Sequence, residues 1–96
     1  MFSTNLEDIL FYADTIISKI VISDCNCVVY YEGWDDKKST LTFNHSKIIY
    51  NTIDPDGERV ETGQLIKLKN NRMRIVLFDD ENKIFLELEY DQCHSI

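Results

Sequence analysis

Residues 65–90 read LIKLKNNRMRIVLFDDENKIFLELEY, and this stretch decides which fold we expect. Apolar and charged residues alternate along it with a period close to two, which is typical of strands that bury one face of a sheet. Polar breaks at residues 70–71 and 79–82 divide the stretch into three segments. We therefore predict three antiparallel strands joined by two short turns. The face predicted to be buried carries Ile66, Leu68, Met73, Ile75, Leu77, Ile84, Leu86 and Leu88.

The first turn sets a register for the strands that it joins. Asparagine tolerates positive φ better than most residues, so a two-residue turn at Asn70-Asn71 is favoured. Opposed residues on neighbouring strands share a face, and this turn places Ile66 opposite Ile75.

The second turn, over residues 79–82, sets the register of the last two strands. We predict Arg74 opposite Glu87 and Val76 opposite Phe85, because the alternative places Val76 opposite Glu87 and gives neither side chain a suitable neighbour. Basic and acidic residues of the outer face then form a charge ladder, which we favour over a nucleic-acid-binding face. The ladder carries Lys67, Lys69, Arg72, Arg74, Glu87 and Glu89. Beside it lies an outer apolar row of Leu65, Val76 and Phe85.

Upstream of this stretch, residues 4 to about 18 have the pattern of an amphipathic helix. Thr4 and Glu7 fit a capping box at its start. The helix is too short to be stable alone, so we expect its apolar stripe to pack on the sheet. Residues 20–23 are expected to be extended already. The stripe consists of Leu6, Ile9, Leu10, Ala13, Ile16, Ile17 and Ile20.

The middle of the chain adds further strands, expected at residues 25–32, 39–44 and 47–53, with a return at 59–64. Asp54-Pro55-Asp56-Gly57 is the clearest turn in the sequence. Sequential strands usually pair, so the expected fold class is α+β. We predict one domain over residues 1–96, with the N-terminal helix packed on a five- to six-stranded antiparallel meander sheet that could curl into a half-barrel.

The composition limits the classes of function. The chain has 96 residues, of which 44% are hydrophobic, and a formal net charge of −7. That charge disfavours direct binding to nucleic acid or to an anionic membrane, and it suits a partner with a basic surface. The N-terminus lacks the basic segment of a secretory signal, and no apolar run is long enough to span a bilayer. We therefore expect a cytoplasmic protein with reduced thiols.

Residues that could carry chemistry do not form a convincing site. Cys25, Cys27, Cys93 and His94 have ligand types that suit zinc, but their spacing is not that of the usual zinc motifs. His45 and Ser46 are adjacent in a turn, and adjacent residues seldom form a catalytic pair. The turn aspartates are explained by turn formation. We predict no metal, no cofactor and no enzymatic activity.

The remaining feature is a surface that combines aromatic and acidic residues. Trp34 lies in a polar loop, where it could act as an interface anchor surrounded by acids that attract a basic partner. The candidate partner-binding residues are Tyr31, Trp34, Asp35, Asp36, Asp54, Asp56, Glu58, Asp79, Asp80 and Glu81.

Our leading hypothesis is a small acidic protein-binding inhibitor without catalysis of its own. In its most concrete form it is an immunity protein or antitoxin of a toxin nuclease, or a phage-type inhibitor of a nucleic-acid enzyme. The alternative is a self-associating structural module that forms a homodimer through the outer sheet face, on which the charge ladder fixes the strand register. A third hypothesis, a small metal-binding protein or enzyme, lacks an assembled site.

Overall fold

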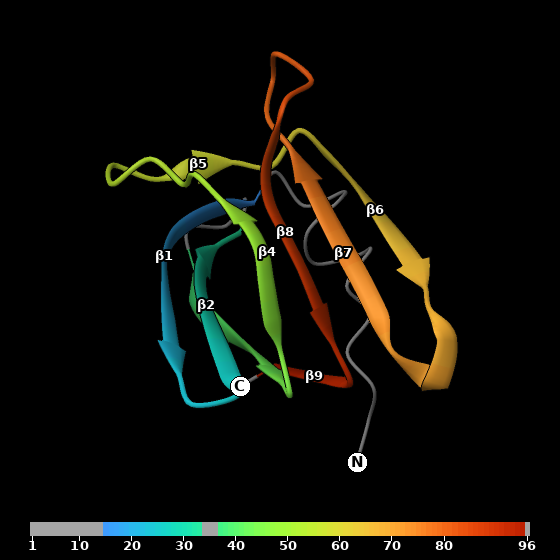
Figure 1. Cartoon of the computed structure of the whole chain (residues 1–96). Coiled ribbons are helices and arrows are strands. Elements are labelled where there is room, and N and C mark those ends of the chain that lie inside the picture. The colour runs from blue at the N-terminus through green and yellow to red at the C-terminus, as the bar shows by residue number, and fades with distance from the viewer. Residues whose placement is uncertain (1–14, 34–36, 96) are drawn as a thin grey trace.

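The computed structural model describes residues 15–33 and 37–95, and within these ranges the chain forms nine β-strands in two antiparallel sheets (Figure 1). The strands are β1 (Ile16–Ser23), β2 (Asn26–Glu32), β3 (Lys38–Asn44), β4 (Lys47–Asn51), β5 (Glu58–Arg59), β6 (Thr62–Lys67), β7 (Met73–Phe78), β8 (Ile84–Tyr90) and β9 (Gln92–Ser95). One sheet has the order β5-β1-β2-β3-β9, and the other has the order β4-β8-β7-β6.

The two sheets are joined where chain segments pass from one to the other. β3 continues into β4, and β8 continues into β9, so one antiparallel ladder bends through a shared corner. The Asp91 N–H donates to the Asn44 carbonyl at 3.0 Å in this corner. A second crossing leads from β5 to β6, where the Val60 N–H donates to the Thr15 carbonyl and the Glu61 N–H to the Phe78 carbonyl, each at 2.9 Å. Strands that switch sheets in this way are typical of orthogonal sheet packing.

The core lies between the sheets and draws buried side chains from both. The larger sheet contributes aliphatic residues and Phe43, whose ring meets the Tyr90 ring edge-on at a centroid distance of 4.9 Å. Burial of this apolar surface is the main favourable term in the folding free energy. The buried core consists of Ile17, Cys27, Val29, Leu41, Phe43, Val60, Ile75, Leu77, Phe85, Leu86, Leu88 and Tyr90.

The predicted α+β fold class is wrong, because the described residues form an all-β fold without an α-helix. The end of the predicted N-terminal helix, from Ile16 to Ser18, is instead the start of β1, which pairs with β2 along its whole length. The β-branched run Ile16, Ile17, Ile20, Val21 and Ile22 favours strand over helix, since such side chains lose rotamer freedom in a helix. The rest of the predicted helix, residues 4–14, lies outside the described residues.

The predicted meander is also wrong. Strands 25–32, 39–44 and 47–53 exist as β2, β3 and β4, but β4 pairs with β8 and β3 pairs with β9. The polar residues around His45 separate β3 from β4, and Asp91 separates β8 from β9. The two breaks lie side by side, since the Asp91 N–H donates to the Asn44 carbonyl. The chain therefore builds two separate sheets, without a closed barrel among the described residues, instead of one curled sheet.

The stretch 65–90 contains the three predicted antiparallel strands, but the first hairpin is one residue out of the predicted register. Its loop has three residues, Lys69–Asn71, and both Asn70 and Asn71 adopt the expected positive φ, 63° and 61°. The extra loop residue reverses the faces of β6. Leu65 therefore lies opposite Ile75 and packs against the core, while Ile66 is exposed.

The second hairpin adopts the register that the sequence argument rejects, with Val76 opposite Glu87 and Arg74 opposite Glu89. The reason is a β-bulge near Phe78, at which Phe85 has no partner on β7 and turns into the core. Phe85 is 1% exposed and Val76 is 4% exposed, so the outer apolar row does not form an accessible surface. The homodimer itself stays a prediction.

Substitutions in this sheet can test the observed register. Leu86→Ala should lower the free energy of unfolding by about 2–5 kcal/mol, because Leu86 is fully buried. Ile66→Ala should cost about 1 kcal/mol or less, because Ile66 is 38% exposed. Urea unfolding measures both values. A loss at Ile66 as large as that at Leu86 would support the originally predicted faces of β6.

Candidate interaction surface

Two acidic turns bring most of the predicted site residues to one end of the molecule. In the turn between β4 and β5, the Asp54 carboxylate accepts the Asp56 N–H at 2.8 Å, and the Asp54 carbonyl accepts the Gly57 N–H at 2.9 Å. Gly57 has φ +105°, which explains why glycine occupies this position. The predicted turn at residues 54–57 is therefore confirmed.

The second acidic turn joins β7 to β8. The Asp79 carboxylate accepts the N–H groups of Glu81 and Lys83, each at 2.9 Å, and Asn82 takes a positive φ of 62°. The Asp79 carboxylate therefore stabilises the turn, whereas the side chains of Asp80 and Glu81 are exposed. The tip projects from the sheet above β5 and β6 in Figure 1.

The two acidic turns are neighbours, because the Glu61 N–H donates to the carbonyl of Phe78, the residue before Asp79, at 2.9 Å. The pKa of Glu58 is raised first by burial, and then by the negative charges of Asp79, Asp54 and Asp80. Residues 54–61 and 79–83 together carry seven carboxylates and two basic side chains, a formal charge of −5 out of −7 for the whole chain. We call these two segments the acidic end.

The loop that contains Trp34, Asp35 and Asp36 lies outside the described residues. Its flanks are described: the Gly33 N–H donates to the Lys37 carbonyl, and β2 ends opposite Ile16, which also pairs with β5. The chain therefore leaves and re-enters the larger sheet near the acidic end. Tyr31 lies on β2, half-buried and packed against the core.

An apolar groove adjoins the acidic end, and the sequence analysis missed it. It has a volume of about 440 Å³ and lies between the edge strand β4 and the start of β8. The sequence pattern assigned Ile84 to the buried face, and nothing in the pattern of residues 47–53 showed which apolar side chains would stay outside. The groove is lined by Ile49, Tyr50, Lys83, Ile84 and Glu87.

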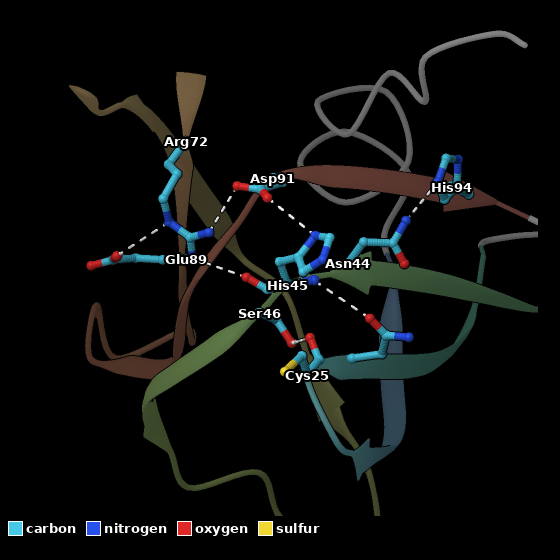
Figure 2. A network of polar contacts seen from close by, with 9 residues as sticks. Cys25, Asn44, His45, Ser46, Arg72, Glu89, Asp91 and His94 are labelled. Atoms are coloured by element: carbon cyan, nitrogen blue, oxygen red, sulfur yellow. Dashed lines mark hydrogen bonds and ion pairs between the residues drawn. The ribbon is translucent and has the colours of Figure 1, made fainter. Parts of the chain in front are cut away.

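At the opposite end of β7, a polar network holds the corner between the sheets (Figure 2). Arg72 Nη1 donates to Asp91 Oδ1 at 2.8 Å, and Arg72 Nη2 donates to the His45 carbonyl at 3.0 Å. The other oxygen of Asp91 lies 3.1 Å from His45 Nδ1. Ser46 Oγ donates to the Cys25 carbonyl at 3.3 Å, so His45 and Ser46 engage different partners. This geometry ties three turns together and does not align a nucleophile with a base.

The predicted ladder of charges is present only in part: Arg72 and Arg74 form ion pairs with Glu87 and Glu89, whereas Lys67 lies opposite Met73 and Lys69 lies in the loop before β7. Arg74 Nη2 lies 2.8 Å from Glu89 Oε2, and Arg74 Nη1 lies 3.6 Å from Glu87 Oε2. Lys47 of β4 is opposite Glu89, which extends the ladder to a third strand. The hydrogen bond from Arg74 is the main reason that the pKa of Glu89 is lowered. Glu89 therefore links neighbouring strands of the four-stranded sheet, through its ion pair with Arg74 and its position opposite Lys47.

The cysteines lie in different environments. Cys25 is exposed, whereas burial raises the pKa of Cys27 to about 11 and that of Cys93 to about 12. His94 is hydrogen-bonded to Asn44 at 2.8 Å. Among the residues that the structure describes, no three His, Cys, Asp or Glu side chains are grouped closely enough to hold a metal ion.

The corner network predicts a stability difference between two basic residues of the same hairpin. Arg72→Met keeps the aliphatic part of the side chain but removes its contacts to Asp91 and His45, so the free energy of unfolding should fall by about 1–2 kcal/mol. Lys69→Met is the matched control, because Lys69 is exposed in the adjoining loop. Urea unfolding measures both variants. Equal losses in the free energy of unfolding for Arg72→Met and Lys69→Met would mean that the network does not stabilise the corner.

Glu58 predicts a pH-dependent change in stability. A carboxyl group whose pKa is raised by folding contributes stability at low pH, and this contribution is lost as the pH rises through the raised pKa. Glu58→Gln should therefore raise Tm at pH 7 by about 1–3 °C and leave it unchanged at about pH 3, where the carboxyl is protonated in both states. Thermal unfolding measures the shift.

The control for this experiment is Glu61→Gln, because Glu61 is not among the carboxylates that raise the pKa of Glu58. The proposed proximity of the two acidic turns would be contradicted if Glu58→Gln raised Tm equally at both pH values. It would also be contradicted if Glu61→Gln raised Tm at pH 7 as much as Glu58→Gln does.

The described residues contain no helix long and apolar enough to cross a membrane. No protein family model, curated protein or solved structure matches this chain.

Proposed function

We propose that the protein is a small non-catalytic inhibitor that binds a basic protein through its acidic end. The observation that carries this proposal is the hydrogen bond from the Glu61 N–H to the Phe78 carbonyl at 2.9 Å, which holds the two acidic turns beside each other. The negative charges of Asp79, Asp54 and Asp80 accordingly help to raise the pKa of Glu58. Two turns that are over twenty residues apart in sequence thus present their carboxylates together. Such a concentration of charge accelerates encounter with a basic surface and gives specificity against acidic ones.

The partner fits best as a protein that itself binds a polyanion. Closely spaced carboxylates resemble the phosphates of a nucleic acid in charge, so they suit the active-site cleft of a nuclease or of another nucleic-acid enzyme. In this form the protein is an immunity protein or antitoxin that blocks a toxin nuclease, or a phage-type inhibitor. The two turns carry this role without any reactive group, because occupation of the cleft is sufficient.

Hydrogen bonds from backbone N–H groups to aspartate carboxylates give the acidic end a defined shape before binding. Asp54 and Asp79 each accept N–H groups of their own turns, so both loops are held by internal contacts. Ordered loops lose less conformational entropy on association than flexible ones, which favours tight binding.

The test uses the partner that co-purifies with the full chain from its source cells and is identified by mass spectrometry. The association rate constant should fall about tenfold or more when NaCl is raised from about 50 to about 500 mM. The triple substitution Asp54→Asn, Asp79→Asn and Asp80→Asn should slow association in the same way. Asparagine retains the carbonyl oxygen that accepts the turn N–H groups, so the loops should keep their shape.

Asp24→Asn is the matched control for a charge lost from a turn. Asp24 is an exposed aspartate between β1 and β2, close to the corner network through the hydrogen bond from Ser46 N–H to the Cys25 carbonyl. It therefore lies at the opposite end of the molecule from Asp79. A rate that is insensitive to salt, or that the control changes as much per charge as the triple substitution does, would disprove the assigned surface.

A further inference from the structure

The apolar side chains that line the groove do not belong to the hydrophobic core. Ile49, Tyr50 and Ile84 line it and are 41%, 46% and 37% exposed. Single exposed apolar residues are common on protein surfaces, but three large ones around one depression are typical of a binding site. Ile48, the neighbour of Ile49 on β4, instead packs against the core.

The backbone explains why these side chains remain outside. β4 is the edge strand of its sheet, and its pairing with β8 shifts register between Ile48 and Tyr50. This bulge makes Ile49 the extra residue, so that Ile49 and Tyr50 are both exposed at the edge. Bulges often direct side chains toward binding sites.

The groove is continuous with the acidic end. Lys83 belongs to both, and Tyr50 precedes Asp54 by four residues. The Thr52 N–H donates to the Phe85 carbonyl at 2.9 Å, which holds the chain that leaves β4 against the start of β8. A molecule in the groove would therefore also face the carboxylates of the second acidic turn.

The charges decide which occupant fits. The two charged groups of the groove wall are already paired within the chain: Lys83 Nζ lies 3.4 Å from Glu81 Oε2, and Arg74 Nη1 lies 3.6 Å from Glu87 Oε2. What remains is an apolar surface beside a region of formal charge −5. A second copy of this chain would bring two such negative regions together, whereas a basic segment would neutralise one.

We propose that the apolar groove receives one large apolar side chain from a lysine- or arginine-rich segment of the partner, while the acidic end binds the basic residues beside it. This inference rests on the proposed function and adds to it the chemistry of the recognised segment. A buried aromatic or aliphatic anchor with charged surroundings is the usual arrangement of an interface hot spot. The acids thus govern the rate of encounter, and the groove governs how long the complex lasts.

The test uses two synthetic peptides of alternating lysine and arginine, which carry either tryptophan or alanine at the central position. Each is titrated into the ¹⁵N-labelled full chain at low salt. The tryptophan peptide should bind about fivefold or more tightly than the alanine peptide, and it should shift the amide signals of Ile49, Tyr50 and Ile84. The alanine peptide should shift mainly the signals of the acidic end.

Variants of the groove should remove only the preference for tryptophan. Ile84→Thr, and separately Ile49→Thr, should bring the two affinities together and leave the alanine peptide unchanged. Threonine keeps the β-branched shape and the strand preference, and a dispersed amide spectrum verifies the fold. Ile66→Thr is the matched control, since Ile66 lies on the other edge strand of the same sheet at a similar exposure of 38%.

The possible outcomes separate this inference from the proposed function. Equal binding of both peptides, weakened by Asp80→Asn, would overturn the groove assignment and still support acidic docking. Binding of neither peptide would also overturn the groove assignment, and the salt dependence of the partner complex then judges the proposed function by itself. Sedimentation that shows a dimer lost on Ile84→Thr would assign the groove to a second copy of the chain and overturn the inference.

Discussion

The corner at Asn44 and Asp91 is the constraint on which the rest of the structure depends. Two paired strands leave one sheet and enter the other at this point, and the Asp91 N–H keeps the ladder intact by donating to the Asn44 carbonyl. Arg72, the residue that precedes β7, reaches the corner and binds both Asp91 and the His45 carbonyl. Without these contacts the bend would leave polar backbone groups unpaired near the core, which is costly. The bend is also what lets two small sheets enclose one core.

The corner also explains how the charges of the molecule are divided. Arg72 and Arg74 form ion pairs at or near the corner, with Asp91 and with Glu87 and Glu89. Their positive charges are therefore used for structure at one end of β7. The turns at the other end carry most of the net negative charge, because turn formation favours Asp there and few bases accompany them. The basic and acidic side chains are therefore separated along the molecule, and this separation supports the proposal that a basic partner approaches the acidic end.

Irregularities in the strands place side chains where regular strands would not. The bulge near Phe78 turns Phe85 into the core, and the register shift in β4 leaves Ile49 and Tyr50 outside. The first strengthens the fold, whereas the second exposes apolar surface that the fold does not need. The two irregularities differ in effect because of where their strands lie in the sheet. β8 is a central strand with β4 and β7 as neighbours, whereas β4 is an edge strand.

The sequence by itself determined much of the local structure: the strands β2, β3, β4, β7 and β8, the turn at residues 54–57, the positive φ of the Asn70-Asn71 pair, and the excess of acids in the turns. These depend on side chains a few residues apart, so periodicity and turn chemistry reveal them. The predicted return at residues 59–64 is instead divided between β5 and β6. Only the tertiary structure decided which strands pair, which face of β6 is buried, that Ile16 and Ile17 belong to a strand, and that Glu58 lies near Asp79. One loop residue reverses a whole strand, and core burial of Phe85 outweighs pairing on the surface. Such outcomes depend on competition between distant contacts, which no local pattern records.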